Sequence, residues 1–529
     1  MNPDGLSYLD MASGAQTSPL KLLNGYWSPG YPALISVAIF LIHPSPGLEF
    51  PLVHFLNLLI FIFVLWSFST FLKYCLASIG GDEVANENRQ GYMVPFAFCT
   101  FLWFTLKIIG TELVTPDLGV AGIAFLAAAL SCRLSLQQPR WWHYVALGFV
   151  LGVGYYVKAA MFSLGLILLV LLVFVLPRSE GITRRKLFLS LCLSFSVFML
   201  VTSPLVAALS FRAKTLSFGE TGRLNYAWYV NGHRWARDVE HPEPYETPNH
   251  PAPKLLTRPV TLEFASPIEG TYPLWYDPSY WYAGLNMRFD FRQQIIALRR
   301  NLGMYKILAL DSAAFISGAI VLLVFAFHQK VGLTVLCQSW WQLAWPLAAC
   351  AMYALVHVEF RFLGAFFVIS FVAVYGSLMF RVDKCAALAI SATVLCTVMV
   401  PFSAHVAKES ACIAGDLVYP KLPEYQIAAL GLRDLGVQGG DRLAIVGYAN
   451  NCYYARYDRL RVVAQIPNAN EFWHLSKPEL KSLTEHLRAI GVKAVVASNG
   501  PDHASAAADW KDVDVSDSLR LNVLLLSHP

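Results

Sequence analysis

The sequence predicts an α-helical polytopic membrane protein with about ten transmembrane helices and a small C-terminal extracytoplasmic α/β domain. Of its 529 residues, 56% are hydrophobic and only 14% are charged, with a mean hydropathy of +0.48, which is unusual for a water-soluble protein. Apolar runs of spanning length recur up to about residue 403. Beyond that point, amphipathic helical patterns alternate with short apolar runs that are typical of strands.

Residues 1–30 are polar and rich in glycine and proline, and they lack the basic and apolar regions of a signal peptide. The apolar run from Tyr31 to His43 is bounded by Pro32 and Pro44 and is shorter than a usual transmembrane span. We therefore predict that 1–50 is a first extracytoplasmic loop with an interfacial helix.

The transmembrane bundle is predicted within 51–403, interrupted by a large loop over 211–301. Ten apolar runs of about the length needed to cross a bilayer define its spans. They lie near 51–76, 92–109, 117–134, 142–157, 159–177, 187–210, 303–328, 332–356, 362–380 and 385–403.

The orientation follows from the bias of Lys and Arg toward cytoplasmic loops. The strongest cluster consists of Arg178, Arg184, Arg185 and Lys186. Counting crossings from it places a second set of basic residues in the cytoplasm, namely Arg89, Arg133, Arg140, His328, Lys330, Arg381 and Lys384. The same count places the N-terminal loop, the turns at Asp117 and Lys158, the loop 211–301, the link 357–361 and the C-terminal domain outside. We expect a multi-pass protein of the plasma (inner) membrane, with its active site extracytoplasmic.

The large loop contains the aromatic segments NYAWYVNG and TYPLWYDPSYWYAGL. Trp and Tyr at this density suit either a membrane-interface belt or stacking against a sugar ring, and both interpretations stay open. Trp275 and Tyr276 are the substrate-binding candidates in this loop.

The segment 404–529 is predicted to be a soluble α/β domain. Its helices are PEYQIAALGLRDLG and KPELKSLTEHLRAIG, and its strands are DRLAIVG, VKAVVAS and LRLNVLLLS. The glycine-rich GVQGG precedes a strand instead of following one, so no nucleotide site is predicted.

The cysteines and histidines show no metal-ligand spacing, and we predict no metal and no cofactor. Eight of the ten cysteines lie in or beside apolar segments, while Cys412 and Cys452 lie in the polar C-terminal part, where a disulfide is conceivable. His233, His241 and His250 are scattered among Pro and Glu in the large loop. The net charge of +5 fits basic membrane loops, and no nucleic-acid partner is predicted.

Charged residues gather where the predicted spans end on the outer side. A charge near hydrocarbon is costly unless it is paired or faces a water-filled cavity. Each of these residues alone could be a solvated loop charge. Together they provide a carboxylate to act as general base and cations to hold an anionic leaving group, as glycosyl transfer from a lipid-phosphate sugar requires. The set is Asp4, Asp10, Glu112, Asp117, Lys158, His357, Glu359 and Arg361.

At these positions the sequence resembles the GT-C glycosyltransferases, specifically the bacterial family 39-like branch related to protein mannosyltransferases and aminoarabinose transferases. The resemblance covers roughly residues 1–400 through short motifs in the same order. DGLSYLDMA with NGYWSPGYPALI is similar to the family's first extracytoplasmic loop, and TPDLG to its second acidic site. GVGYYVKAA looks like the helix that ends in a lysine near the lipid phosphate, and HVEFRFLGAF like the late His-x-Glu-x-Arg-Tyr segment.

Two features depart from the family pattern. The family has a transmembrane helix before the aspartate loop, whereas Met1 stands only three residues before Asp4, so we expect a misassigned start or a fragment. Phe362 stands where the family often has Tyr, and Phe360 where Pro is common.

The resemblance implies an inverting transfer of a monosaccharide from a polyprenyl-phosphate donor to an acceptor outside the cytoplasm, in contact with membrane lipid. Asp4 would be the base and Asp117 the second acidic residue, while Lys158 and Arg361 would bind the lipid phosphate. The substrate-binding candidates are Tyr8, His357, Glu359, Trp275 and Tyr276. The acceptor stays unknown and could be a protein, a lipid or a glycan.

Two other functions remain open from the sequence. A transporter or lipid flippase would also be a ten-span bundle, commonly with internal repeats or with charged or broken helices near the membrane midplane. Asp311 is the one acid well inside a predicted span. A non-catalytic membrane scaffold that presents the C-terminal domain is the other alternative.

Overall fold

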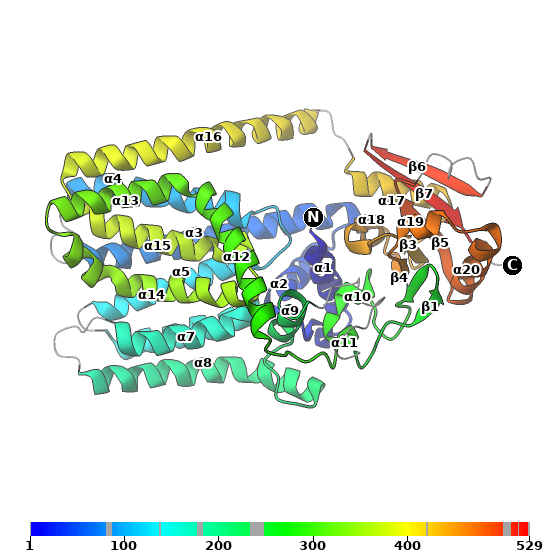
Figure 1. Cartoon of the computed structure of the whole chain (residues 1–529), viewed down its shortest axis with the longest axis horizontal. Helices are drawn as coiled ribbons and strands as arrows, with labels where there is room; N and C mark the ends of the chain where they lie inside the picture. Colours follow the sequence, from blue (N-terminus) through cyan, green and yellow to red (C-terminus); the bar gives the residue numbers. More distant parts are fainter. Residues whose placement is uncertain are drawn as a thin grey trace.

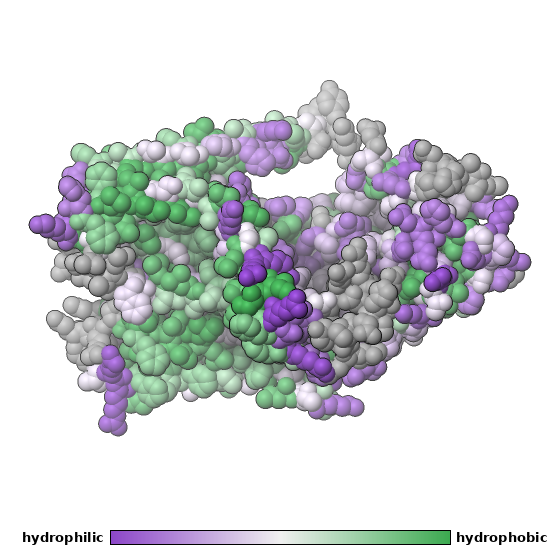
Figure 2. Space-filling view, in the orientation of Figure 1, coloured by the Kyte–Doolittle hydropathy of each residue, from purple (hydrophilic) through white to green (hydrophobic). Residues whose placement is uncertain are grey.

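The computed structural model describes residues 2–80, 87–136, 139–176, 183–232, 248–418, 422–500, 509–516 and 518–526. Arg178, His233 and His241, which were singled out in the sequence, lie outside these ranges. Figure 1 shows a bundle of long, roughly parallel helices at one end of the molecule and a sheet domain at the other, with short helices between them. Figure 2 shows that the bundle surface is largely apolar and that the sheet end is mixed and more polar.

Most bundle helices overlap the predicted spans, and the fold class of a polytopic α-helical membrane protein is confirmed. In chain order they are α3 (Glu49–Gly80), α4 (Glu87–Trp103) with a π-helical continuation (Phe104–Ile109), α5 (Asp117–Ser135), α6 (Trp141–Val157), α7 (Ala160–Val175), α8 (Arg184–Ala213), α12 (Phe291–Asp311), α13 (Ala313–His328), α14 (Gly332–Val356), α15 (Phe360–Met379) and α16 (Lys384–Val418). Within the described ranges, six helices are long and apolar enough to cross a membrane, or seven if the bent pair α12 and α13 is one span. By this criterion the count is lower than the predicted ten, because helices such as α6 and α7 are only 17 and 16 residues long.

The span predicted over 303–328 is wrong in shape. The structure divides it at Ser312 into α12 and α13, whose axes differ by 76°. The helix α12 also begins at Phe291, inside the segment that was predicted as loop. Asp311, which the sequence places inside a span, is instead exposed at this bend.

The N-terminal segment is helical where the sequence predicted a loop. Helix α1 (Pro3–Ala15) is buried from Gly5 to Ala12, and its apolar side chains pack in a cluster with Trp27, Tyr31 and Val53. Helix α2 (Gly30–Ile42) has 13 residues and carries exposed apolar side chains, in keeping with the predicted interfacial helix. Asp4 therefore sits in the first turn of a packed helix.

The sheet has seven strands in the order β1-β2-β4-β3-β5-β7-β6. Strands β3 (Arg442–Val446), β4 (Arg461–Ile466) and β5 (Val492–Ser498) are parallel, whereas β6 (Trp510–Ser516) and β7 (Leu519–Leu525) are antiparallel to their neighbours. Helices α17 (Glu424–Asp434), α18 (Tyr453–Tyr457), α19 (Ala469–Trp473) and α20 (Lys477–Ala489) accompany it. The predicted α/β character is confirmed, and each helix and strand predicted after residue 403 is present.

Two strands of this sheet come from the large loop. β1 (Lys254–Thr257) and β2 (Val260–Glu263) form a hairpin, and β2 pairs antiparallel with β4 through Leu262 and Gln465. The loop also holds the short helices α9 (Thr221–Tyr229), α10 (Pro273–Tyr276) and α11 (Pro278–Trp281). The last bundle helix, α16, continues to Val418, well past the predicted end near 403. The loop and the C-terminal segment thus build one sheet.

The possible disulfide between Cys412 and Cys452 is not formed. Both are free thiols, and Cys412 is exposed on α16 whereas Cys452 is buried beside α18. The thiol of Cys452 packs in the apolar core below the sheet, as a small apolar side chain would.

Candidate active site

A cavity of about 820 Å³, open solvent at its mouth included, lies where the bundle helices end beneath the short helices of the loop. Most of the predicted site residues line it, although they come from segments far apart in the chain: Asp4, Tyr8, Asp117, Lys158, Trp275, His357, Glu359 and Arg361.

Four of these residues form one ion network. The ammonium of Lys158 donates to Asp117 over 2.6 Å. Arg361 contacts both carboxylates, with 3.0 Å from its Nη2 to Asp4 Oδ2 and 3.4 Å from its Nε to Asp117 Oδ2. The network has two positive and two negative groups, so each buried charge has a partner.

The local structure explains why these side chains meet. Asp4 and Asp117 stand in the first turns of α1 and α5, each next to a proline, where the partial positive charge of the helix N-terminus favours a carboxylate. Lys158 has an extended backbone conformation and lies between α6 and α7. Arg361 is the second residue of α15, directly after an extended link. The helices α5, α6 and α15 have 19, 17 and 20 residues. Their ends therefore bring Asp117, Lys158 and Arg361 to one level.

Lys158 is held by an aromatic ring as well as by a carboxylate. Its Nζ lies 3.4 Å from the centroid of the Phe362 ring, a cation–π contact. Phe362 is the residue that stands where the family resembled by the sequence often has Tyr, and here its ring supplies this contact. Burial lowers the pKa of Lys158 from its ordinary value, although the nearby Asp117 carboxylate acts in the opposite direction.

His357 and Glu359 form a pair at the edge of the cavity. His357 Nε2 lies 3.1 Å from Glu359 Oε1, and this hydrogen bond holds the pKa of Glu359 below its usual value. The His357 ring stacks on Tyr229, with ring centroids 3.7 Å apart and planes 3° from parallel. Tyr229 was not predicted as a single residue, but it belongs to the aromatic segment NYAWYVNG that the sequence analysis singled out.

Aromatic residues form another part of the cavity lining. Trp275 lines the cavity, and its carbonyl accepts hydrogen bonds from Trp27 Nε1 at 3.0 Å and Ser7 Oγ at 2.9 Å. Tyr26 packs against Trp27 and Trp275. Tyr8 is fully buried in this part of the lining, and burial raises the pKa of its hydroxyl well above the usual value.

Three of the other sequence candidates lie elsewhere. Tyr276 does not line the cavity and packs instead near Gly270, beside Asp10. Glu112 also lies outside the lining, and its carbonyl contacts His54. Asp10 belongs to a separate cluster, described next.

Asp10 takes part in a buried junction between four parts of the chain. The guanidinium of Arg456, on α18, contacts Asp10 at 2.8 Å, Glu49 of α3 at 3.0 Å and Ser13 of α1 at 2.6 Å. Asp10 also accepts two hydrogen bonds from Thr271 in the loop. The C-terminal domain is thus tied by charge to the helix that carries Asp4.

The sequence analysis did not name several lining residues as site candidates, although most of them lie inside segments that it quoted. They are Tyr26, Trp27, Ser28, Thr115, Thr221, Asn225, Tyr229, Tyr353 and Phe362. Their place inside the quoted motifs TPDLG and HVEFRFLGAF is the signal that could have found Thr115 and Phe362. Thr221 and Asn225 lie on α9, whose place above the cavity depends on the fold of the whole loop.

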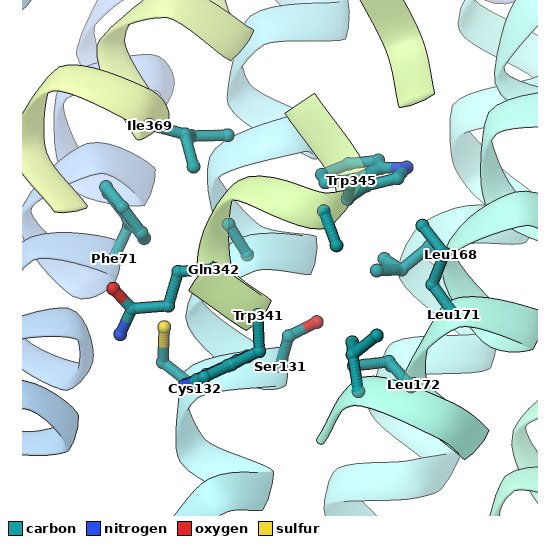
Figure 3. Close-up of a pocket in the computed structure, with 13 residues that line it drawn as sticks. Phe71, Ser131, Cys132, Leu168, Leu171, Leu172, Trp341, Gln342, Trp345 and Ile369 are labelled. Carbon is teal, nitrogen blue, oxygen red and sulfur yellow. The ribbon is translucent and has the colours of Figure 1, made fainter. Parts of the chain in front are cut away.

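A second cavity lies inside the bundle, and its chemistry differs. Figure 3 shows it bordered by apolar side chains such as Leu168 and Trp345, with Gln342, Ser131 and Cys132 as the polar groups. The Gln342 amide already donates to Ser78 over 2.8 Å. None of the described residues that line this cavity is charged, so they supply neither a carboxylate base nor a cation.

No profile of a known protein family matches the chain, and no curated protein matches it. Among solved structures, it is similar to ArnT from Cupriavidus metallidurans in the apo state, with 14% identity and a TM-score of 0.43 over 100% of this chain and 94% of that one. The same protein bound to undecaprenyl phosphate gives 13% identity and a TM-score of 0.39, with the same coverage of 100% and 94%.

The apo oligosaccharyltransferase from Archaeoglobus fulgidus gives 11% identity and a TM-score of 0.46, over 94% of this chain but 65% of that one. At TM-scores below 0.5, these likenesses by themselves assign neither a family nor an activity to this chain.

Proposed function

We propose that this protein is a membrane glycosyltransferase that moves a monosaccharide from a polyprenyl-phosphate donor to an acceptor by an inverting displacement. The observation that carries the proposal is the ion network at the cavity. Two carboxylates and two cations from four distant segments meet at the end of an apolar bundle. A lipid-linked anionic substrate needs this combination of a hydrocarbon environment and cations at head-group depth.

The two cations suit the leaving group. As the bond between the sugar C1 and the phosphate oxygen breaks, the electron pair stays on that oxygen and the lipid phosphate gains negative charge. Lys158 and Arg361 border the cavity and would stabilise this charge, Arg361 as a planar fork and Lys158 as a point charge. The Phe362 ring and Asp117 hold the Lys158 ammonium in place for this role.

Asp4 is the group best suited to be the base. Its side chain is 20% exposed, against 3% for Asp117, so an acceptor can reach it. Asp4 would take the proton from the acceptor hydroxyl or amine while the acceptor atom attacks C1 from the face opposite the phosphate. One bond forms as the other breaks, so the configuration at C1 is inverted.

The remaining lining residues would position the sugar and the acceptor. Trp275, Tyr26 and Tyr229 offer ring faces for a pyranose. Tyr8, His357 and Glu359 offer hydrogen-bonding groups at the edges of the cavity. On the Lys/Arg bias of the sequence we place this cavity and the sheet domain outside the cytoplasm, at the plasma (inner) membrane.

The decisive experiment is transfer of radiolabelled sugar from a panel of polyprenyl-phosphate monosaccharides by membranes that contain the chain. Transfer by the wild type that is lost in Asp4→Asn would support both the activity and the base. The matched control is Asp434→Asn, which removes one exposed carboxylate from the sheet domain. Full activity of Asp4→Asn would exclude Asp4 as the base, and transfer of no sugar by the wild type would reject the proposal in favour of a transporter or a scaffold.

A further inference from the structure

Helix α12 runs across the end of the bundle instead of along it. Figure 1 shows it crossing the ends of the long helices, and its axis turns by 76° from that of α13. One face is fixed to the C-terminus of α14. Gln294 donates to the Leu355 carbonyl at 2.7 Å, and Asn301 donates to the Ala354 and Val356 carbonyls at 2.8 and 3.1 Å. Carbonyls of the last helical turn lack partners inside their own helix, so these bonds fix the orientation of α12.

The opposite face of α12 carries a row of cations. Arg292, Arg299 and Lys306 follow one another at intervals of seven residues, which places them on one side of a helix over roughly 21 Å. All three are exposed. Within the described part of the chain, none of them has an acidic side chain in salt-bridge range, unlike the cations of the cavity. Asp290 is occupied at the helix start, where it accepts from the Gln293 amide.

Large apolar side chains flank this row on both sides. Phe291 and Leu302 lie along one flank, Ile296 and Ile307 lie along the other, and Leu310 lies at the end of the helix, each between 48% and 70% exposed. Figure 2 shows hydrophilic and hydrophobic surface side by side over α12. Cations interleaved with exposed apolar residues are typical of a helix that lies in a membrane interface. An acidic protein surface would match the charges but would leave the apolar side chains without a partner.

We propose that α12 lies in the plane of the membrane surface and binds the head groups of anionic phospholipids through Arg292, Arg299 and Lys306. The flanking apolar side chains would enter the acyl region, and the cations would stay at head-group depth. In the predicted orientation this end of the bundle faces away from the cytoplasm, so the positive-inside rule does not account for the row. The inference does not depend on the proposed transferase activity.

The test is a titration of the purified full chain, in an uncharged detergent, with phosphatidylglycerol or with phosphatidylcholine, read as the midpoint of thermal unfolding. A lipid that binds the folded state raises this midpoint. We expect phosphatidylglycerol to raise it at far lower concentrations than phosphatidylcholine. The triple substitution Arg292→Gln, Arg299→Gln and Lys306→Gln should shift the phosphatidylglycerol titration by on the order of 100-fold, since each cation near an anionic surface contributes a roughly five-fold gain in affinity.

The matched control removes three exposed cations of the sheet domain, by Lys477→Gln, Lys481→Gln and Lys511→Gln, and should titrate like the wild type. Equal midpoints of wild type and triple variant without lipid show that the variant folds. If that variant does not fold, the three single substitutions should each give a shift of roughly five-fold. Identical titrations of the α12 variant and the control would overturn the proposal. Equal stabilisation of the wild type by inorganic phosphate would also overturn it, because the row would then take a free anion and not a lipid surface.

Discussion

The substitution Arg456→Met removes the cation from the buried junction between the sheet domain and α1. Arg456 is 9% exposed, and its two carboxylate partners, Asp10 and Glu49, are 7% and 9% exposed. Removing one partner of a buried ion pair costs about 3–5 kcal/mol, since the other charge is left without a counter-ion. Here two carboxylates and the Ser13 hydroxyl lose their partner together, so we expect the free energy of unfolding to fall by about 5 kcal/mol, the upper end of that range.

A variant in which all three charges are removed separates the effect of unpaired charge from the effect of lost packing. Arg456→Met combined with Asp10→Asn and Glu49→Gln has no unpaired charge, and neutral replacements of buried ion clusters often cost little. We expect this triple variant to regain most of the lost stability. The assay is unfolding of the purified full chain in mixed detergent micelles, with sugar transfer measured in parallel, because α1 carries both Asp10 and Asp4. A single variant as stable as the wild type, or a triple variant no more stable than the single, would refute this reasoning.

Two further predictions concern Lys158. Burial lowers the pKa of Lys158, and the positive charge of its ammonium is lost as the pH rises through that pKa. A free lysine has a pKa of about 10.4. We therefore expect wild-type transfer to decline at a lower pH than the pKa of a free lysine. The Lys158→Arg variant stays charged, so its transfer should decline only at a higher pH. The same decline at high pH in the variant and the wild type would contradict the role of Lys158. Phe362→Leu removes the ring under the ammonium and should raise the KM for the polyprenyl-phosphate donor by roughly 5- to 30-fold, for a contact of about 1–2 kcal/mol. Phe362→Tyr, which keeps a ring, should retain the wild-type KM, and equal KM values for the Leu and Tyr variants would count against the contact.

Many residues of the cavity could be predicted because the side of the membrane on which each loop lies follows from counting the crossings along the whole sequence. Asp117 and Lys158 each stand where an apolar run ends, and the count of crossings puts both at the same end as Arg361. The helices α5, α6 and α15, which are similar in length, then bring these three residues to one level. No pairing between these residues could be read from the sequence, because Asp4 and Arg361 are 357 positions apart and no local pattern links them.

The errors have physical reasons as well. The N-terminal segment is rich in glycine and has only a short apolar run, which favoured a loop. The helix α1 is nevertheless stabilised by contacts with distant parts of the chain, such as the hydrogen bond from Ser7 to the Trp275 carbonyl. Once α1 is a helix, Asp4 and Asp10 lie on different faces, since six residues correspond to about 600° of rotation. The strand β2 escaped prediction because its partner β4 lies some 200 residues later, as the pair Leu262 and Gln465 shows.

The two carboxylates at the cavity are bound differently, and this difference underlies the roles that we propose for them. Asp117 contacts both cations, Lys158 through one oxygen and Arg361 through the other, and only 3% of its side chain is exposed. Protonating it would leave two buried cations with a weaker counter-charge, which makes it a poor proton acceptor. Asp4 contacts only Arg361 among the cavity cations, and its other oxygen is not engaged by that group. Both aspartates were predicted from the sequence to be catalytic. We propose from these contacts that Asp4 is the base that reaches the acceptor and that Asp117 holds Lys158 and Arg361 in place at the cavity.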